Sequence, residues 1–229
     1  MIVDLDKGQP IATLKGRGAD EVIAWFNSRP QAERDLVEVV VLDRSKAYCA
    51  AVKAVFGDQV QVIDRFHVIK QAVDALDEVL RSVQKPLDPE EANALKKLRK
   101  RWLKSADQLH VEELIARYEW RRRFPELREM LNWVQDLRKW FDRKYEKPAR
   151  EALLKLIERA TQSAQEPLQR LVGTLTRWFD PILRYIRQRS TNGITEGVNN
   201  KIKLIQRMAY GLRHEHQRRK CILAWCGAP

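Results

Sequence analysis

The first third of the chain reads as short apolar runs separated by turns and two helical stretches. Residues 2–5 and 11–14 are apolar runs on either side of the turn sequence DKGQ at residues 6–9, which predicts a β-hairpin. The next segment repeats apolar residues at helical spacing and predicts a helix over residues 19–28.

Two further apolar runs, residues 37–42 and 60–63, stand on either side of a helical pattern over residues 45–56. Short strands joined by a helix run parallel, so both end at the same edge of their sheet. Asp43 follows the first strand and Asp64 follows the second. Open α/β sheets bind ligands at that edge, so both carboxylates are candidate metal ligands. Alternatively, each aspartate caps the helix that follows it.

The pattern over residues 67–188 is almost wholly helical, with an apolar stripe from Val68 to Val83 as its first member. We expect most tryptophans and leucines of this segment to pack between helices, because aromatic side chains dominate protein cores. Stacking of a single tryptophan on a nucleobase is the alternative. A last helix over residues 168–186 is expected to be interrupted near Pro181.

The remaining segment, residues 189–229, begins with a polar stretch around Glu196 and continues as helices. Val198, Ile202, Ile205 and Met208 predict the buried face of the first helix. The basic residues predict a surface for a phosphate backbone beside Glu196. They are Lys201, Lys203, Arg207, Arg213, Arg218, Arg219 and Lys220.

Composition favours a nucleic-acid partner. The 229 residues carry a formal net charge of +12 and 44% are hydrophobic, so a sizeable core and a polyanionic partner are both expected. A merely solvated basic surface is the alternative. The three cysteines match neither a disulfide framework nor a zinc pattern. With no apolar run long enough to span a bilayer, we expect a cytoplasmic protein, associated with the nucleoid when it binds DNA.

Two motifs carry a family resemblance. The stretch DRFHVIK at residues 64–70, followed by ALD at 75–77, resembles bacterial insertion-sequence transposases of the ISL-three type. GITEGVNNKIK at residues 193–203 and RMAYGLR at 207–213 look like the C-terminal signature of that family. The resemblance covers nearly the whole chain, and the motifs occur in the family's order.

This resemblance implies a DDE transposase with a ribonuclease-H-like core that a helical insertion interrupts. The fold class is then α/β plus α. Residues 1–66 form part of the core, residues 67–188 the insertion, and residues 189–229 the C-terminal helices of the core. By the same resemblance Glu196 is the last acidic residue of the triad, and the partners are transposon-end and target DNA and further copies of the chain.

The resemblance leaves a choice for the second acidic residue. In the strand order 3-2-1-4-5 of a ribonuclease-H-like sheet, the strand before Asp43 neighbours the first strand, and the strand before Asp64 lies one strand further away. Strands lie about 4.8 Å apart, so this geometry favours Asp43 and Glu196 as ligands of Mg²⁺ or Mn²⁺. Asp64, Arg65 and His67 then orient the site or contact DNA.

The sequence departs from the family pattern at its start. We expect the first strand, with the first catalytic aspartate, and the zinc-binding and helix-turn-helix parts to lie upstream of Met1. Asp4 and Asp6 do not replace that aspartate, because they belong to a strand antiparallel to the first. Without the central strand, sheet edges stay unpaired. We therefore expect a poorly stable chain, a strand taken from a partner, or a different pairing.

Three functions remain open. The chain is a truncated transposase whose catalysis is lost or impaired, an active fragment that receives its missing aspartate from elsewhere, or a non-catalytic DNA-binding or regulatory protein. Its status as an enzyme is therefore left undecided by the sequence.

Overall fold

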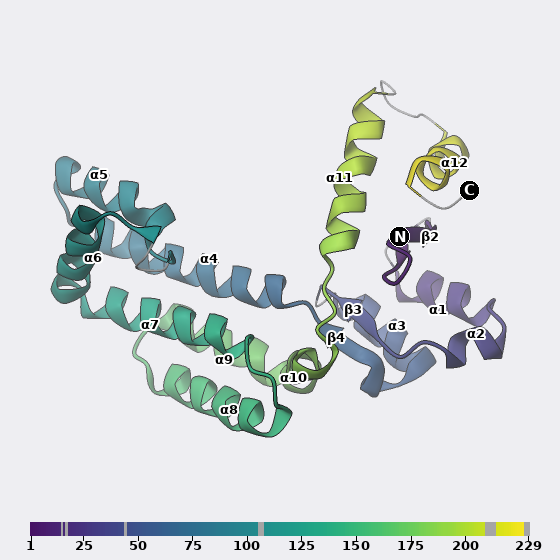
Figure 1. Cartoon of the computed structure of the whole chain (residues 1–229), viewed down its shortest axis with the longest axis horizontal. Helices are drawn as coiled ribbons and strands as arrows, with labels where there is room; N and C mark the ends of the chain where they lie inside the picture. The colour runs from purple at the N-terminus through teal and green to yellow at the C-terminus, as the bar shows by residue number, and fades with distance from the viewer. Residues whose placement is uncertain (15, 17, 44, 105–107, 209–213, 227–229) are drawn as a thin grey trace. The chain divides into compact units, whose positions relative to one another are not determined.

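The computed structural model describes residues 1–14, 16, 18–43, 45–104, 108–208 and 214–226. The chain divides into two compact units. We call Met1–Asp64 together with Arg189–Pro229 the α/β unit, and Arg65–Gln188 the helical unit. In the sequence, the helical unit is therefore inserted between the last parallel strand and the C-terminal helices (Figure 1). None of the described helices is long and apolar enough to cross a membrane.

The α/β unit begins with the predicted hairpin. Strands β1 (Ile2–Asp4) and β2 (Gln9–Ala12) pair antiparallel. Asp4 Oδ1 accepts the N–H groups of Asp6 and Lys7, each at 3.0 Å, and so organises the turn. Gly8 has a φ of 68°, in the left-handed region that glycine tolerates best. The hairpin prediction is confirmed.

The predicted parallel pair is also present. Strand β3 (Val40–Leu42) and strand β4 (Gln61–Ile63) run parallel, joined by α3 (Lys46–Phe56) and the 3₁₀ turn η1 (Asp58–Val60). Helix α1 (Ala19–Asn27) packs against α3.

Strand β3 is shorter than the apolar run predicted. The expected start at residue 37 is wrong, because the Val37 N–H donates to the carbonyl of Arg34 at 3.1 Å and belongs to the turn after α2. Helix α2 (Gln31–Asp35) has no buried residue. It therefore has no apolar stripe by which the sequence could reveal it.

The hairpin and the parallel pair form separate two-stranded sheets, and no strand of the described residues joins them. This separation agrees with the expectation that the two pairs lack a common neighbour. Helices α11 (Gly193–Met208) and α12 (Glu215–Cys226) pack against each other and against β2.

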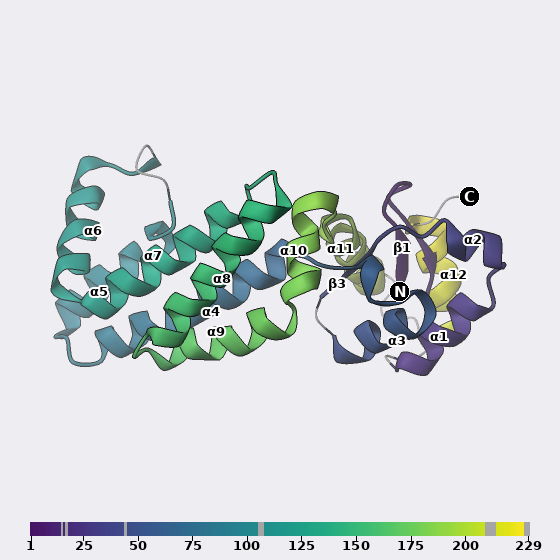
Figure 2. The same cartoon turned by 90° about the horizontal axis from the view of Figure 1, so that it is seen from below.

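The helical unit is built around its first and longest helix, α4, which packs against α7 and α9. Helix α8 packs against α7, α9 and α10 (Figure 2). The helices of the unit are α4 (Arg65–Gln84), α5 (Pro89–Leu98), α6 (Val111–Arg123), α7 (Pro125–Trp140), α8 (Glu146–Gln162), α9 (Glu166–Arg177) and α10 (Phe179–Gln188), with a 3₁₀ turn η2 at Arg99–Arg101.

Tryptophans form the centre of this unit, as predicted. Trp102, Trp133 and Trp140 are almost fully buried. The indole N–H of Trp133 donates to the Leu156 carbonyl at 2.9 Å, and that of Trp140 donates to the Ala149 carbonyl at 2.7 Å. Both bonds join α7 to α8.

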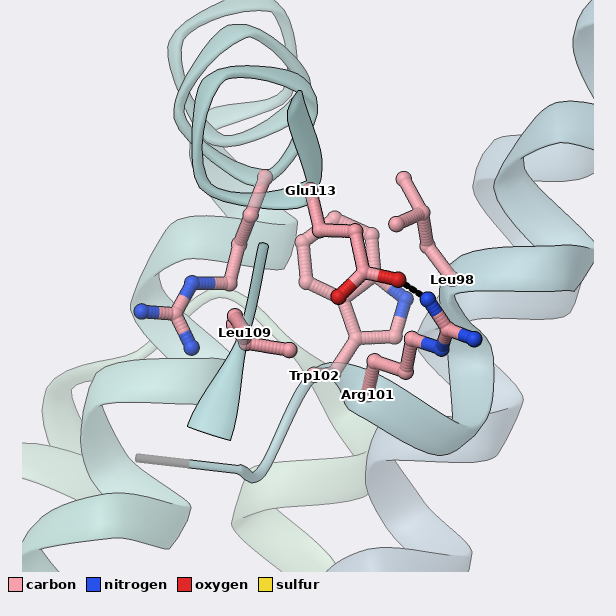
Figure 3. A pocket seen from close by; sticks show the side chains of 6 residues that line it. Leu98, Arg101, Trp102, Leu109 and Glu113 are labelled. Carbon is pink, nitrogen blue, oxygen red and sulfur yellow. Dashed lines mark ion pairs between the residues drawn. The ribbon is translucent and has the colours of Figure 1, made fainter. Parts of the chain in front are cut away.

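Trp102 lies near the other end of the unit. There an ion pair between Arg101 and Glu113 lies beside its ring and joins η2 to α6 (Figure 3).

The predicted interruption of the last helix near Pro181 is confirmed. The break lies at Trp178, whose ψ of 22° ends α9, and not at Pro181. Pro181 falls in the first turn of α10. Proline is tolerated there because the first N–H groups of a helix have no partner within the helix.

Candidate functional site

Asp43 and Asp64 occupy equivalent positions after neighbouring parallel strands. Leu42 and Ile63 are paired in the β3–β4 register. The Asp64 N–H donates to the Leu42 carbonyl at 3.2 Å, which extends the pairing by one bond. The prediction that both strands end at the same edge is confirmed. The two carboxylates differ in environment, since Asp43 is exposed and Asp64 is only 3% exposed.

The buried carboxylate of Asp64 reaches the start of α11. Its Oδ2 accepts the backbone N–H of Asn192 at 3.1 Å. The carbonyl of Asn192 in turn accepts the N–H of Glu196 at 2.9 Å, the bond that starts the helix. A single residue therefore connects Asp64 to the turn of α11 that carries Glu196. No local pattern could reveal this bond, because Asp64 and Asn192 are 128 residues apart.

Asp43 stabilises the turn into α3 without capping that helix. Its Oδ1 accepts the Ser45 N–H at 3.2 Å, while the Ser45 hydroxyl accepts the Tyr48 N–H as the N-cap. Burial, with a smaller contribution from the charge of Asp43, raises the pKa of Cys49 to about 11. A neutral thiol therefore lies near an exposed carboxylate.

Glu196 begins a polar stripe along α11. It is exposed in the first turn of the helix, and Asn200, Lys203 and Arg207 are exposed at positions four, seven and eleven residues further on. Residues at this spacing lie on one face of a helix. With a rise of 1.5 Å per residue, this face runs about 16 Å from Glu196 to Arg207.

Another face of α11 packs inward through Val198 and Ile205, as predicted. The prediction for Met208 is wrong, because this side chain is largely exposed at the last residue of the helix.

Two other basic residues predicted to bind DNA, Lys201 and Arg219, have partners within the α/β unit. Lys201 Nζ donates to the Trp225 carbonyl and so holds α12 against α11. The half-buried Arg219 donates to the Thr13 carbonyl, just after β2. Lys220 is exposed on α12. Arg213 and the side chain of Arg218 lie outside the described residues.

Arg65 and His67 belong to the first turn of α4 in the helical unit. Arg65 is exposed, and its guanidinium carbon lies 6.0 Å from the centre of the Tyr185 ring. His67 is half-buried, with its ring centre 5.7 Å from that of Phe66.

The acidic residues that the structure describes do not form a complete three-carboxylate metal centre. Within the described part of the chain, no three or more His, Cys, Asp or Glu side chains lie close enough to hold one ion. Mg²⁺ prefers oxygen ligands, commonly takes one or two carboxylates and keeps several waters. The two exposed carboxylates, Asp43 and Glu196, have suitable chemistry for such an ion.

Comparison with known proteins gives the family. Residues 1–221 match the DDE transposase family of the ISL3 type, described as Transposase. The chain is 28% identical over 206 residues to the transposase for insertion sequence element IS1001 of Bordetella parapertussis. That alignment covers 87% of this chain and 50% of the relative, so the chain spans half of the relative's length.

No solved structure matches the chain. The match to the family nevertheless extends over almost the whole sequence and includes both motifs that carried the resemblance. The chain belongs to the ISL3-type transposases.

Proposed function

We propose that this chain acts in DNA transposition as part of a ribonuclease-H-like transposase core, in which Asp43 and Glu196 hold Mg²⁺ or Mn²⁺ against a DNA strand. The bond from Asp64 to Asn192 carries this proposal, because it joins the end of β4 to the start of the helix that bears Glu196. The divalent ion would supply charge stabilisation at the phosphate that is cut.

The carboxylates have distinct roles in this proposal. Asp43 and Glu196 are exposed and can face a hydrated ion and a DNA phosphate. Asp64 is buried and bonded to a backbone N–H, which suits a residue that positions α11. Since the described residues offer no group of three acidic ligands, we propose that the chain by itself is catalytically impaired.

The polar stripe of α11 provides a path for the strand. Asn200, Lys203 and Arg207 follow Glu196 on the same exposed face. Lys203 and Arg207 lie about 6 Å apart along the helix axis, so the two cations can neutralise neighbouring phosphates. The net charge of +12 would favour association with DNA over a long range.

Metal binding and strand cleavage test the carboxylate roles. Glu196→Gln should reduce Mn²⁺ binding, measured by electron paramagnetic resonance, and should abolish any Mn²⁺-dependent nicking of transposon-end DNA. Asp43→Asn should likewise reduce Mn²⁺ binding and abolish nicking. Glu33→Gln removes an equal charge from exposed α2 and should change neither measurement. Wild-type Mn²⁺ binding in the Asp43→Asn and Glu196→Gln variants would overturn the metal assignment.

DNA binding tests the stripe. Lys203→Ala/Arg207→Ala should weaken binding and lower the salt dependence, the slope of log affinity against log salt, by roughly two, because each phosphate contact contributes about 0.9. Lys201→Ala is the matched control, since Lys201 donates to the Trp225 carbonyl. An unchanged slope in the double variant would remove the stripe from the DNA path.

A non-catalytic DNA-binding or regulatory protein is the second candidate function. The observation that favours it is the lack of a three-ligand acidic group among the described residues. This function would be supported over the first if the chain binds DNA specifically and shows no metal-dependent nicking. Nicking should stay absent when a second copy or a longer relative is added.

A further inference from the structure

One end of the helical unit gathers basic and aromatic side chains that the proposed core does not use. At this end α4 begins, α7 ends, α8 begins and α10 lies alongside (Figures 1 and 2). Arg65, Phe66, Lys144, Tyr145 and Lys147 are exposed or largely exposed there. We call these five residues the basic aromatic end.

Aromatic contacts hold the parts of this end together. The Phe141 ring, at the end of α7, meets the Tyr185 ring of α10 edge to face at 5.4 Å. Arg65, at the start of α4, lies 6.0 Å from the centre of the same Tyr185 ring. The segment after α7 and the first turn of α4 are therefore both fixed around Tyr185.

The side chain of Tyr145 is exposed and does not cap the helix that it precedes. It occupies the N-cap position of α8, where its side chain makes no capping hydrogen bond. Ser, Thr, Asp or Asn at this position typically stabilises a helix by about 1 kcal/mol. The ring is instead 74% exposed to solvent. Beside the unpaired lysines described next, this exposed ring offers a face on which a ligand can stack.

The charges around Tyr145 are predominantly positive. Residues 139–150 include five basic and two acidic residues. One of the acids, Glu146, is paired with Arg187 at 3.7 Å. Lys144 and Lys147 make no ion pair with any described residue.

The opposite end of the helical unit differs, because three of its arginines are paired with carboxylates. Arg99 pairs with Asp77, Arg101 with Glu113, and Arg123 with Glu91. The two lysines beside the exposed ring therefore remain unpaired among the described residues, whereas part of the positive charge at the far end is paired with carboxylates.

We propose that the basic aromatic end binds a DNA strand with unpaired bases, with Tyr145 stacking on a base and Lys144, Lys147 and Arg65 meeting phosphates. This inference rests on the proposed role in DNA transposition. Base stacking on aromatic side chains beside a positive groove is the usual way in which proteins hold single strands. Intact duplex DNA or an acidic peptide would use the lysines but would leave the ring uncovered.

Binding of the full chain to two DNA probes, without metal, tests the proposal. One probe is a duplex and the other is the same duplex with a single-stranded tail. Tyr145→Ala should weaken binding of the tailed probe about tenfold, since a stacked base contributes roughly 1–3 kcal/mol. It should leave the duplex affinity and the salt slope unchanged. Tyr145→Phe keeps the ring and should bind like the wild type.

Variants that remove positive charge test whether the lysines contact phosphates. Lys144→Ala/Lys147→Ala should reduce the salt slope for the tailed probe by roughly two. Lys96→Ala/Lys97→Ala removes equal charge from exposed positions of α5 and should reduce the slope less. Equal losses in the two double variants, or a Tyr145→Ala variant that binds the tailed probe normally, would overturn the proposal.

The proposed core and this surface fail separately. If Lys203→Ala/Arg207→Ala weakens binding of both probes while Tyr145→Ala has no effect, the role proposed for the basic aromatic end is wrong. The role proposed for the core then still stands. If the wild-type chain binds neither probe, the proposed role in DNA transposition is wrong, and so is this inference.

Discussion

The helical unit and the α/β unit differ in how they bury their large side chains. The helical unit buries three tryptophans and fixes two of their indole N–H groups with backbone acceptors. Among its described residues, the α/β unit has two short two-stranded sheets and leaves the large side chains of Leu204 and Trp225 exposed. Stability is therefore concentrated in the helical unit, and the residues proposed for metal chemistry are in the less consolidated unit. Functional segments are often drawn from the less stable parts of a protein.

Limited proteolysis should show the largest difference between the units. Trypsin should cut the α/β unit first, because its short sheets give little protection against local opening. A resistant fragment close to residues 65–188 should accumulate and be identifiable by mass spectrometry. Cleavage that begins inside α4 or α7 would reverse the assignment of stability.

Substitution of tryptophan should give the next largest difference. Trp133→Ala creates a cavity and leaves the Leu156 carbonyl without its donor, at a cost of about 3–5 kcal/mol in the free energy of unfolding. Trp225, which is 58% exposed, should cost no more than about 0.5 kcal/mol when replaced by alanine. Urea unfolding followed by far-ultraviolet circular dichroism measures both. Similar losses would show that the two units share one core.

Loss of the hydrogen bond between Asp64 and Asn192 should have a smaller effect on stability, confined to the start of α11. Asp64→Ala leaves the part-buried Asn192 N–H without its acceptor, a loss of about 1 kcal/mol. Asp64→Asn keeps an acceptor oxygen. Hydrogen exchange over residues 192–198 should therefore accelerate in the alanine variant and change little in the asparagine variant.

The same two variants separate positioning from metal binding. Mn²⁺ binding by Asp64→Asn should stay close to that of the wild type, in contrast to Asp43→Asn. Loss of Mn²⁺ in the Asp64→Asn variant would make Asp64 a metal ligand instead.

Thiol reactivity should give the smallest effect. The pKa of Cys49 is raised to about 11 from 9.0, so this thiol should hold about a hundredfold less thiolate at pH 8. Cys49 should therefore react with iodoacetamide more slowly than the half-buried Cys221 and Cys226. Asp43→Asn removes one of the two causes and should speed the reaction of Cys49 modestly. Mass spectrometry of labelled peptides between pH 7 and pH 10 follows each cysteine.

The same pKa has a consequence for stability at high pH. The unfolded chain loses the Cys49 proton near pH 9 while the folded chain keeps it, so the free energy of unfolding should fall as the pH rises from 9 to 11. Cys49→Ala removes this component. A variant with the same pH dependence as the wild type would show that other groups cause the decline.

Local periodicity was sufficient to predict most of the elements. The hairpin, the parallel pair and the apolar stripe of α4 all follow from spacing and turn chemistry, because these signals lie within a few residues. The common edge of Asp43 and Asp64 followed from the topology of a strand–helix–strand unit. Helix α2 has no buried face and so gave no signal.

Long-range partners could not be predicted in this way. Asp43 and Asp64 are the same residue type after similar strands, yet only Asp64 is buried against a residue 128 positions away. Lys201 and Arg219 resemble their basic neighbours, but both bond to carbonyls of other elements. Tertiary packing decides which basic side chains bond within the α/β unit, and no local sequence pattern distinguishes them.

The bond between Asp64 and Asn192 also has a consequence for the order of folding. Closing a flexible loop of 128 residues costs about 4 kcal/mol in chain entropy, more than one hydrogen bond returns. The folded helical unit removes most of this cost, because Arg65 and Tyr185, near its two ends, already lie together. The inserted helices should therefore collapse first and act as a template that allows Glu196 to reach its place.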